Sequence, residues 1–313
     1  MSVKHVFILN PAAGKRNVVS ELTASIEKTF RQDPILRHEP YEIHSTAGAG
    51  DATAIAEQAA KEHDGPLRLY ACGGDGTLNE VVCGAVGKEN VAVCPVPVGS
   101  GNDFIKYFED IPRDRFLDVG AACRGDAAPC DVLKVAGHYC LNIASVGLDA
   151  ITAARQKKVK KFPLVSGAFA YKIALGYSFL SAMKNPIRLV VDGKEEDVGK
   201  GCVTIAAAGN GRFYGGGFKA TPLADIRDGL IDFIAIPSMS RLSFLKYVGD
   251  YQKGLHMESM KELLFYRRCK KVQFLSPRPV VVQADGEIFT LKDPEIEILP
   301  GALNLILPRA SDA

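Results

Sequence analysis

Residues 73–80 have the sequence Gly-Gly-Asp-Gly-Thr-Leu-Asn-Glu, and this segment restricts the possible folds of the chain more than any other. Residues 67–72 before it are apolar enough for a buried strand, and residues 78–86 after it can form a helix. A strand, a glycine turn and a helix in this order direct free backbone N–H groups toward an anion, and glycine lets the backbone approach a phosphate closely. The alternative is a simple tight turn with a capped helix, but an acid between glycines is an uncommon way to build one.

Two side chains of this turn suit phosphate chemistry. Asp75 lies between glycines, where an acid fits the coordination shell of Mg²⁺ better than direct contact with a phosphate. Thr77 can cap the following helix or contact a phosphate oxygen. The turn therefore predicts a phosphate site that works with a metal ion.

Composition places the chain among globular proteins with room for two domains. It has 313 residues, of which 47% are hydrophobic and 24% charged, and its net charge of +2 gives no overall attraction to nucleic acid. Its eight cysteines form no C-x-x-C pair, which argues against a zinc site or a disulfide framework and for a reducing, cytoplasmic location. The apolar run at the N-terminus is too short for a signal peptide.

The first 120 or so residues alternate between strand and helix patterns. Strand-like segments at 6–9, 41–45, 67–72 and 91–96 are separated by helical segments, among them an alanine-rich stretch at 51–62. This alternation predicts a parallel sheet with helices on both faces. Ligands of such sheets bind beyond the carboxyl ends of the strands, so the loops that follow these strands are expected to line one crevice.

The pattern changes near residue 129. Strand-like runs with short turns follow, and Asp192-Gly193 and Asp285-Gly286 are hairpin signals. The predicted strands are 131–135, 139–144, 187–191, 202–208, 230–236, 272–274, 280–284, 296–299 and 303–307, and the predicted helices are 162–183 and 241–253. We therefore expect an α/β domain at 1–128 and a mostly antiparallel β domain, similar to a sandwich, at 129–313.

Two further loops have small residues where a strand ends. The turn from Asn10 to Lys15 can fold against phosphates or ribose with Lys15 as a charge partner, although it lacks the spacing of a P-loop. In the glycine turn at 97–104, Ser100 can donate to a phosphate, and Asn102 and Asp103 can cap the next helix. Neither loop matches G-x-G-x-x-G, which disfavours a dinucleotide site.

Taken together, these motifs resemble the diacylglycerol kinase catalytic family, which includes bacterial diacylglycerol kinases and the sphingosine and ceramide kinases. The resemblance extends through most of the chain. Its segments are 10–14, 73–80, 97–104, 142–150, the glycine-rich stretch 209–217, 222–232 and Asp285-Gly286-Glu287. A Gly-Gly-Asp-Gly turn is also found in NAD kinases and phosphofructokinases, so the first half alone is less specific.

The resemblance implies that the nucleotide lies in a cleft between the two domains and that Asp75 acts on a catalytic Mg²⁺, through water. Ser100 stands where the family often has Thr, which preserves the hydroxyl. The residues implied to contact ATP are Asn10, Pro11, Ala12, Ala13, Gly14, Thr46, Gly73, Gly74, Asp75, Gly76, Thr77, Leu78, Asn79 and Ser100.

In the second half, the resemblance implies that Glu287 is the general base for the lipid hydroxyl. An Asp-Gly turn alone does not indicate a catalytic residue, because Asp192-Gly193 is the same kind of turn and has no assigned chemistry. Asp285 is either a turn residue or part of an acidic cluster.

The resemblance further implies a structural Mg²⁺ bound by Asp225, Asp228 and the backbone carbonyl of Leu230. Two carboxylates and a carbonyl in one turn suit a hard cation. The alternative is an ordinary turn, partly neutralised by Arg227.

The implied activity is transfer of the γ-phosphate of ATP to a lipid hydroxyl, with diacylglycerol giving phosphatidic acid. The alternatives are a small-molecule kinase similar to NAD kinase and a non-catalytic protein that binds lipid or nucleotide. The basic run 155–161 predicts reversible contact with an anionic membrane at its inner face, through Lys157, Lys158, Lys160 and Lys161. A homodimer is compatible with the family, and no nucleic-acid partner is expected.

Overall fold

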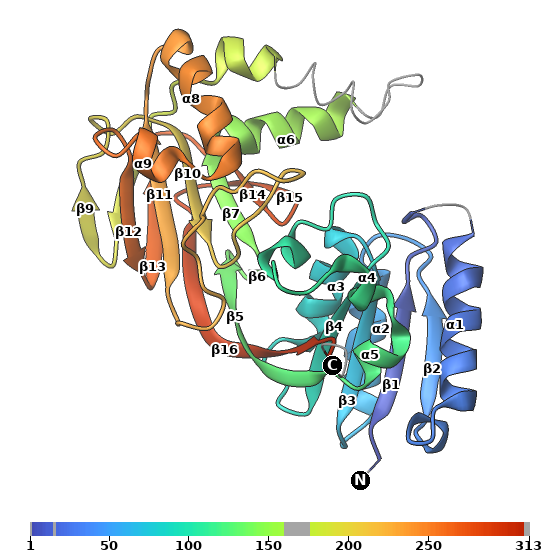
Figure 1. The fold of residues 1–313 in the computed structure, drawn as a ribbon. Coiled ribbons are helices and arrows are strands. Elements are labelled where there is room, and N and C mark those ends of the chain that lie inside the picture. Colours follow the sequence, from blue (N-terminus) through green and yellow to red (C-terminus); the bar gives the residue numbers. More distant parts are fainter. Residues whose placement is uncertain (1, 15–16, 160–175, 310–313) are drawn as a thin grey trace. The chain divides into compact units, whose positions relative to one another are not determined.

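The computed structural model describes residues 2–14, 17–159 and 176–309, which fall into two compact units (Figure 1). Unit 1 comprises Met1–Val132 and Pro300–Ala313, and unit 2 comprises Leu133–Leu299. Strands β5 (Asp126–Val135) and β16 (Glu295–Leu307) each contribute residues to both units. Lys15 and residues 162–175 of the helix predicted at 162–183 lie outside the described residues.

Unit 1 is built on a parallel sheet with the strand order β2-β1-β3-β4. Strand β1 (Lys4–Leu9) pairs in parallel with β2 (Tyr41–Ser45) and β3 (Leu67–Gly73), and β3 pairs in parallel with β4 (Val91–Pro97). The predicted parallel sheet is therefore confirmed, and the carboxyl ends of all four strands meet at one edge.

Helices cover both faces of this sheet, as the alternating pattern predicts. Phe7 and Leu9 point to the face covered by α1 (Val18–Gln32) and α5 (Val119–Cys123), where they pack with Ile26 and Phe30. Helices α2 (Asp51–Glu62) and α3 (Asp75–Ala85) pack against each other, and α3 contacts β3 and β4. The remaining short elements of unit 1 are η1 (Leu36–His38), η2 (Phe104–Tyr107) and α4 (Arg113–Leu117).

Unit 2 contains antiparallel strands in two sheets. The first has the order β12-β11-β10-β7-β14-β15, with bounds Phe265–Cys269, Ile231–Pro237, Val203–Gly209, Ile143–Gly147, Val280–Ala284 and Glu287–Leu291. In the second, β13 (Lys271–Leu275) pairs with β16 and β8 (Arg188–Val191), β8 pairs with β9 (Lys194–Glu196), and β5 pairs with β6 (His138–Cys140). The predicted antiparallel β domain is confirmed.

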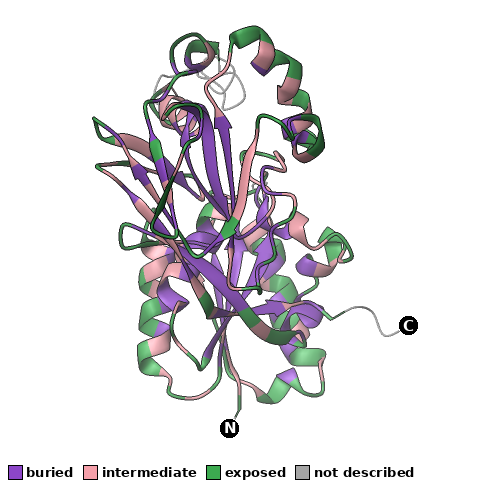
Figure 2. Ribbon diagram, turned by 90° about the vertical axis from the view of Figure 1, so that its left-hand side faces the viewer, coloured by how far each residue is buried: buried purple, intermediate pink, exposed green. Residues whose placement is uncertain are grey.

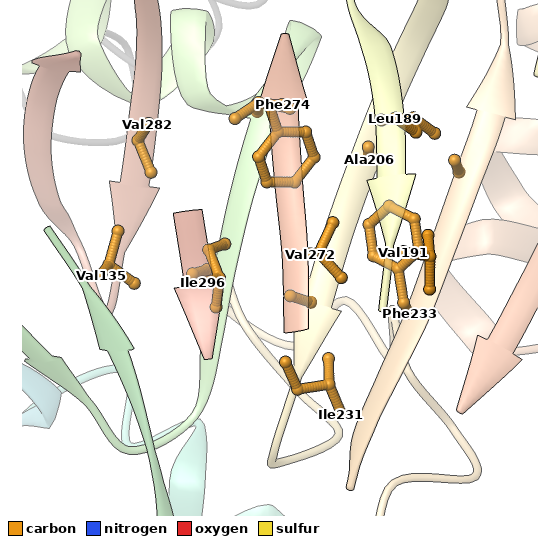
Figure 3. Close-up of a cluster of buried hydrophobic side chains, with 14 of the residues drawn as sticks. Val135, Leu189, Val191, Ala206, Ile231, Phe233, Val272, Phe274, Val282 and Ile296 are labelled. Carbon is orange, nitrogen blue, oxygen red and sulfur yellow. The ribbon is translucent and has the colours of Figure 1, made fainter. Parts of the chain in front are cut away.

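The main core of unit 2 lies between these two sheets. Figure 3 shows Phe233 and Val282 from the first sheet and Phe274, Leu189 and Ile296 from the second, pointing into one apolar layer. The strands are largely buried, whereas the helices carry many of the exposed residues (Figure 2). Alternating apolar residues on facing strands thus produce the sandwich.

A second apolar cluster joins the helices of unit 2 to the first sheet. It includes Ile205, Ile234 and Phe244, and the helices are α6 (Leu148–Val159), α8 (Arg241–Lys253), α9 (His256–Ser259) and a helical stretch at 176–181. None of the helices in the described part of the chain has the length and apolar character needed to cross a membrane.

Two strand predictions differ from the structure. The predicted strand at 139–144 is divided into β6 and β7, because the backbone N–H groups of Leu141 and Asn142 donate to the carboxylate of Asp285. The two strands predicted at 296–299 and 303–307 form the single strand β16, which has Gly301 with φ of 58° along its length.

Candidate nucleotide and metal site

The turn after β3 depends on the absence of a side chain at Gly73. A Cβ at this position would lie 2.2 Å from the hydroxyl oxygen of Thr77. Helix α3 begins at Asp75, with Gly74 at its N-cap, rather than at the predicted Leu78. The acid therefore occupies the first turn of the helix, at the end where unpaired N–H groups favour negative charge.

The glycine turn after β4 lies against the turn after β3. The amide of Gly99 donates to the carbonyl of Gly73 at 3.0 Å. The side chains of Asn102 and Arg113 both donate to the carbonyls of Pro97 and Gly99, which fixes the shape of this second turn. The predicted capping by Asp103 is not made, because its side chain forms no cap hydrogen bond to η2.

The loop after β1 is tied to the same turn. The side-chain amide of Asn10 donates to the hydroxyl of Thr77 at 2.9 Å, and its oxygen accepts from the amide of Ala12 at 2.9 Å. The amide of Thr46, after β2, donates to the carbonyl of Leu9. Thr77 is buried and serves to connect two loops, not to cap α3.

Each loop predicted to hold ATP thus lies at the carboxyl edge of one sheet. The members are Asn10, Pro11, Ala12, Ala13, Gly14, Thr46, Gly73, Gly74, Asp75, Gly76, Thr77, Leu78, Asn79 and Ser100, all within unit 1. Gly14 has φ of 77°, and a Cβ there would lie 2.6 Å from the carbonyl oxygen of Val98, so this loop also packs on the turn after β4. Whether each residue binds nucleotide remains a prediction.

A second carboxylate, Asp103, lies beside Asp75. The carboxylate of Asp75 accepts from the amide of Phe104 at 3.2 Å, and Asp103 forms an ion pair with Lys106 at 2.5 Å. Burial raises the pKa of Asp75, and the negative charge of Asp103 raises this pKa further, against hydrogen bonds from backbone N–H groups that lower it. From the sequence, Asp103 is predicted only to cap the next helix. The signal for a joint site was that both acids follow the ends of neighbouring strands.

The Asp75–Asp103 pair fits a divalent cation, because a positive charge between two repelling, partly buried carboxylates would relieve their repulsion. Both side chains are short, so a bound Mg²⁺ would keep several waters. No group of three or more acidic, histidine or cysteine side chains suited to a metal is found among the described residues. The pair therefore suits Mg²⁺ shared with phosphate oxygens better than a cation held by protein alone.

A hollow of about 380 Å³ lies at the turn after β4 and η2, and neither Asp75 nor Asp103 is part of its lining. It is lined by Ser100, Gly101, Asn102, Ile105, Lys106, Phe108, Glu109, Ile111 and Arg113. Its size is within the range of small-molecule sites, and Ser100 is exposed at its lining. Its lining combines apolar side chains with two cations, Lys106 and Arg113, and one acid, Glu109.

In unit 2, the two Asp-Gly turns have the same backbone conformation. Asp285 and Gly286 have φ of 46° and 86°, and Asp192 and Gly193 have φ of 48° and 80°. Positive φ at both central residues defines the tight hairpin turn that Asp-Gly favours. The turn geometry alone therefore gives residue 285 no special chemistry.

The aspartate has the same task in both turns, which is to accept backbone hydrogen bonds. Asp285 accepts from the amides of Leu141, Asn142 and Ile143 at 2.6, 3.1 and 3.1 Å. Asp192 accepts from the amides of Lys270 and Lys271, each at 2.9 Å. Burial raises the pKa of the Asp285 carboxyl to about 6, against the effect of these donors. These contacts agree with the first alternative from the sequence, in which Asp285 is a turn residue.

The two turns differ at the next position, which is Glu287 in one and Lys194 in the other. Glu287 begins β15 with a side chain that is 59% exposed, and Lys157 of α6 donates to it at 3.2 Å. An exposed carboxylate on a fixed turn is available to a ligand. Its role as general base is still a prediction.

The predicted structural metal turn contains Asp225 and Asp228, each with one carboxylate oxygen accepting a backbone N–H. These donors are the amides of Arg227, at 3.1 Å, and Leu230, at 3.0 Å. Arg268 lies 3.8 Å from Asp228. Two carboxylates in one turn suit a hydrated cation, while Arg268 supplies a competing positive charge. Metal binding here also stays a prediction.

Comparison with known proteins identifies the family. Residues 4–135 match the model of the diacylglycerol kinase catalytic domain, and residues 142–307 match the YegS C-terminal NAD kinase beta sandwich-like domain. The chain belongs to the diacylglycerol kinase family. Membership of this family supports a lipid kinase and agrees with the resemblance seen in the sequence.

Members of this family from several bacteria are similar over most of the chain. A diacylglycerol kinase from Bacillus subtilis is 28% identical over 310 residues, covering 96% of this chain and 95% of its own. A diacylglycerol kinase from Mycobacterium tuberculosis is 27% identical over 307 residues, covering 96% and 94%. A probable YegS-like lipid kinase from Pectobacterium atrosepticum is 30% identical over 214 residues, covering 68% of each chain.

Solved structures support the fold. The crystal structure of a putative diacylglycerol kinase from Bacillus anthracis has a TM-score of 0.75 with 24% identity, covering 99% of this chain and 96% of that one. At this identity the likeness concerns the fold alone.

Proposed function

We propose that this protein transfers the γ-phosphate of ATP to the hydroxyl of a membrane lipid and that the acceptor is diacylglycerol. The observation that carries the proposal is the Asp75–Asp103 pair at the amino end of α3, beside the glycine turns after β3 and β4. Free N–H groups and a cation on two acids are the means by which kinases bind and neutralise phosphates.

In this proposal, Mg²⁺ supplies positive charge to the phosphates when it is bound. Asp75 and Asp103 would hold the cation, and the loops that contain Asn10, Gly74 and Ser100 would orient the phosphate chain with hydrogen-bond donors. Because phosphoryl transfer needs little covalent help from the protein, such positioning is the main contribution of these residues.

Glu287 takes the proton of the lipid hydroxyl. As the hydroxyl oxygen forms its bond to the γ-phosphorus, the bond to the bridging oxygen breaks and ADP leaves. A positioned general base of this kind typically contributes about 10²–10⁴-fold to the rate. The exposed carboxylate of Glu287 and its fixed turn support this assignment. We also propose that Asp225, Asp228 and the Leu230 carbonyl hold a second, structural cation.

The experiment is a radiolabelled γ-phosphate transfer assay with Mg²⁺ and diacylglycerol in mixed micelles. The parent is compared with Asp75→Ala and Glu287→Gln. Organic-soluble label that disappears in both folded variants supports the proposal. Label on NAD in the absence of lipid would make the protein a small-molecule kinase instead, and ATP binding without transfer to any of a panel of lipids would make it a non-catalytic binding protein.

Peripheral contact with an anionic membrane is part of the proposal, because the substrate resides in a bilayer. Lys157 and Lys158 on α6 are described, whereas Lys160 and Lys161 lie outside the described residues. Neutralising all four is expected to weaken binding to anionic vesicles in a salt-dependent way. Unchanged binding would remove the basic run from the proposal. A homodimer remains compatible with it.

A further inference from the structure

Four large apolar side chains of unit 2 stay exposed at the place where α8 meets the helical stretch 176–181. They are Tyr177, Leu180, Leu242 and Leu245, with exposures of 61%, 62%, 81% and 57%, and we call them the leucine face. Isolated exposed leucines are ordinary, but a group rimmed by polar residues marks an interaction surface. The four residues come from two segments far apart in the sequence, and both segments lie in unit 2 (Figure 1).

Specific contacts hold these two segments together. The guanidinium of Arg241 donates to the carbonyls of Phe179, at 3.1 Å, and Leu180. The rings of Phe179 and Phe244 lie 5.9 Å apart on the inner side, within the apolar cluster that rests on the sheet. The inner aromatic residues thus pack in the core of unit 2, whereas the leucines of the leucine face do not contribute to that core and remain exposed to solvent.

Helix α8 has an exposed stripe of unusual composition. Its seven exposed residues are Arg241, Leu242, Leu245, Lys246, Gly249, Gln252 and Lys253. At about 100° per residue they fall within an arc of about 140°. The stripe combines two leucines with three cations, and none of its exposed members is acidic. Asp250 is half-buried at the edge of this arc.

A further cation lies beside the leucine face. The guanidinium of Arg155 lies 4.3 Å from the ring centre of Tyr177, and it donates to the hydroxyls of Ser178 and Ser181 at 2.9 Å. Of the nearby carboxylates, Glu287 is paired with Lys157, and Asp149 accepts from the hydroxyl of Tyr214. Cations from both α6 and α8 therefore lie next to the exposed apolar residues.

We propose that the leucine face and the cations of α8 form the surface by which this protein docks on an anionic lipid bilayer. Leucines among lysines and arginines on one side of a helix are the pattern of helices that lie in the membrane interface, where side chains enter the acyl boundary and cations meet lipid phosphates. The inference rests on the proposed function, since an enzyme whose acceptor stays in a bilayer must reach it there.

The test uses vesicles of phosphatidylcholine with and without phosphatidylglycerol, and the full chain. The Leu242→Ser, Leu245→Ser double variant is expected to bind anionic vesicles about tenfold or more weakly, because two apolar side chains no longer enter the membrane. Lys246→Gln is expected to weaken binding about fivefold at low salt and much less at high salt. Ile35→Ser, which alters an exposed apolar residue of unit 1 (64% exposed), is the matched control and should bind as the parent does.

A kinase assay separates this inference from the proposed function. With diacylglycerol in vesicles the double variant should be slower than the parent, and with a short-chain, water-soluble diacylglycerol the two should be equal. If the double variant loses vesicle binding but the parent phosphorylates neither form of diacylglycerol, the docking surface is supported and the proposed function is wrong.

Two results would overturn the docking surface. The first is vesicle binding equal to that of the parent in both the double variant and the single Leu242→Ser variant, when thermal unfolding curves show that both variants are folded. The second is a change from dimer to monomer in the double variant without any change in vesicle binding, which would assign the leucine face to a second copy of the chain.

Discussion

The amide of Gly99 donates a hydrogen bond to the carbonyl oxygen of Gly73 at 3.0 Å. This bond joins the turns after β3 and β4 at the edge of the parallel sheet. The two backbones are so close that a Cβ on Gly99 would lie 2.5 Å from the Cα of Gly74. Glycine at position 99 is therefore required for this contact, whereas a Cβ on Gly74 would lie at an ordinary distance of 3.7 Å from the Cα of Gly99.

Gly99→Ala is therefore expected to push the two turns apart. Forcing a methyl group into a packed backbone contact typically costs about 1–3 kcal/mol, so the free energy of unfolding should fall by that amount. The affinity for an ATP analogue should fall as well, because the donors of both turns move. Thermal unfolding and calorimetric titration measure the two effects.

Gly48→Ala is the control for this prediction, since a Cβ at Gly48 meets no atom within 4 Å. It should leave both stability and nucleotide affinity close to those of the parent. Equal behaviour of the two variants would show that the contact between the turns has no energetic importance.

Asp75 and Asp103 are expected to interact through their charges. The pKa of Asp75 is raised by burial and by the charge of Asp103, so Asp103→Asn should lower it. Carbon-13 NMR of the Asp75 carboxyl in the metal-free protein, followed over a pH titration, measures the shift. A pKa that stays the same in Asp103→Asn would mean that the two carboxylates do not form a pair.

The parallel half of the fold was predictable because strand patterns, glycine turns and helical stretches alternate regularly between residues 6 and 96. The strand order only suggests that Asp103 and Asp75 lie at the same edge of the sheet; their proximity depends on a turn whose shape is held by the side chains of Asn102 and Arg113. Likewise, the break between β6 and β7 depends on the distant carboxylate of Asp285. Local patterns do not encode contacts of this range.

Glu287 and Lys157 are expected to respond differently to neutralisation. Glu287→Gln should lower kcat by about 10²–10⁴-fold if the carboxylate takes the proton of the acceptor, with little change in ATP affinity. Lys157→Gln breaks an ion pair whose side chains are 61% and 59% exposed, so the free energy of unfolding should change by less than about 1 kcal/mol. Steady-state kinetics and urea unfolding give these quantities. A kcat of Glu287→Gln within a few-fold of the parent would remove Glu287 from the chemistry.

Asp285 should make the stability of unit 2 depend on pH. Burial raises its pKa to about 6 in the folded protein, against about 3.9 for an unfolded aspartate. The folded state therefore binds the proton more tightly, and the stabilising effect is complete below the unfolded pKa and is lost as the pH rises through about 6. Asp285→Asn cannot titrate, so the stability of the parent relative to this variant should decrease between pH 4 and pH 7, as measured by urea unfolding at several pH values. Glu287→Gln, two residues away and exposed, should follow the parent over the same range. A difference between parent and Asp285→Asn that is constant with pH would mean that the Asp285 carboxyl stays ionised when folded, held by the three amides of residues 141–143.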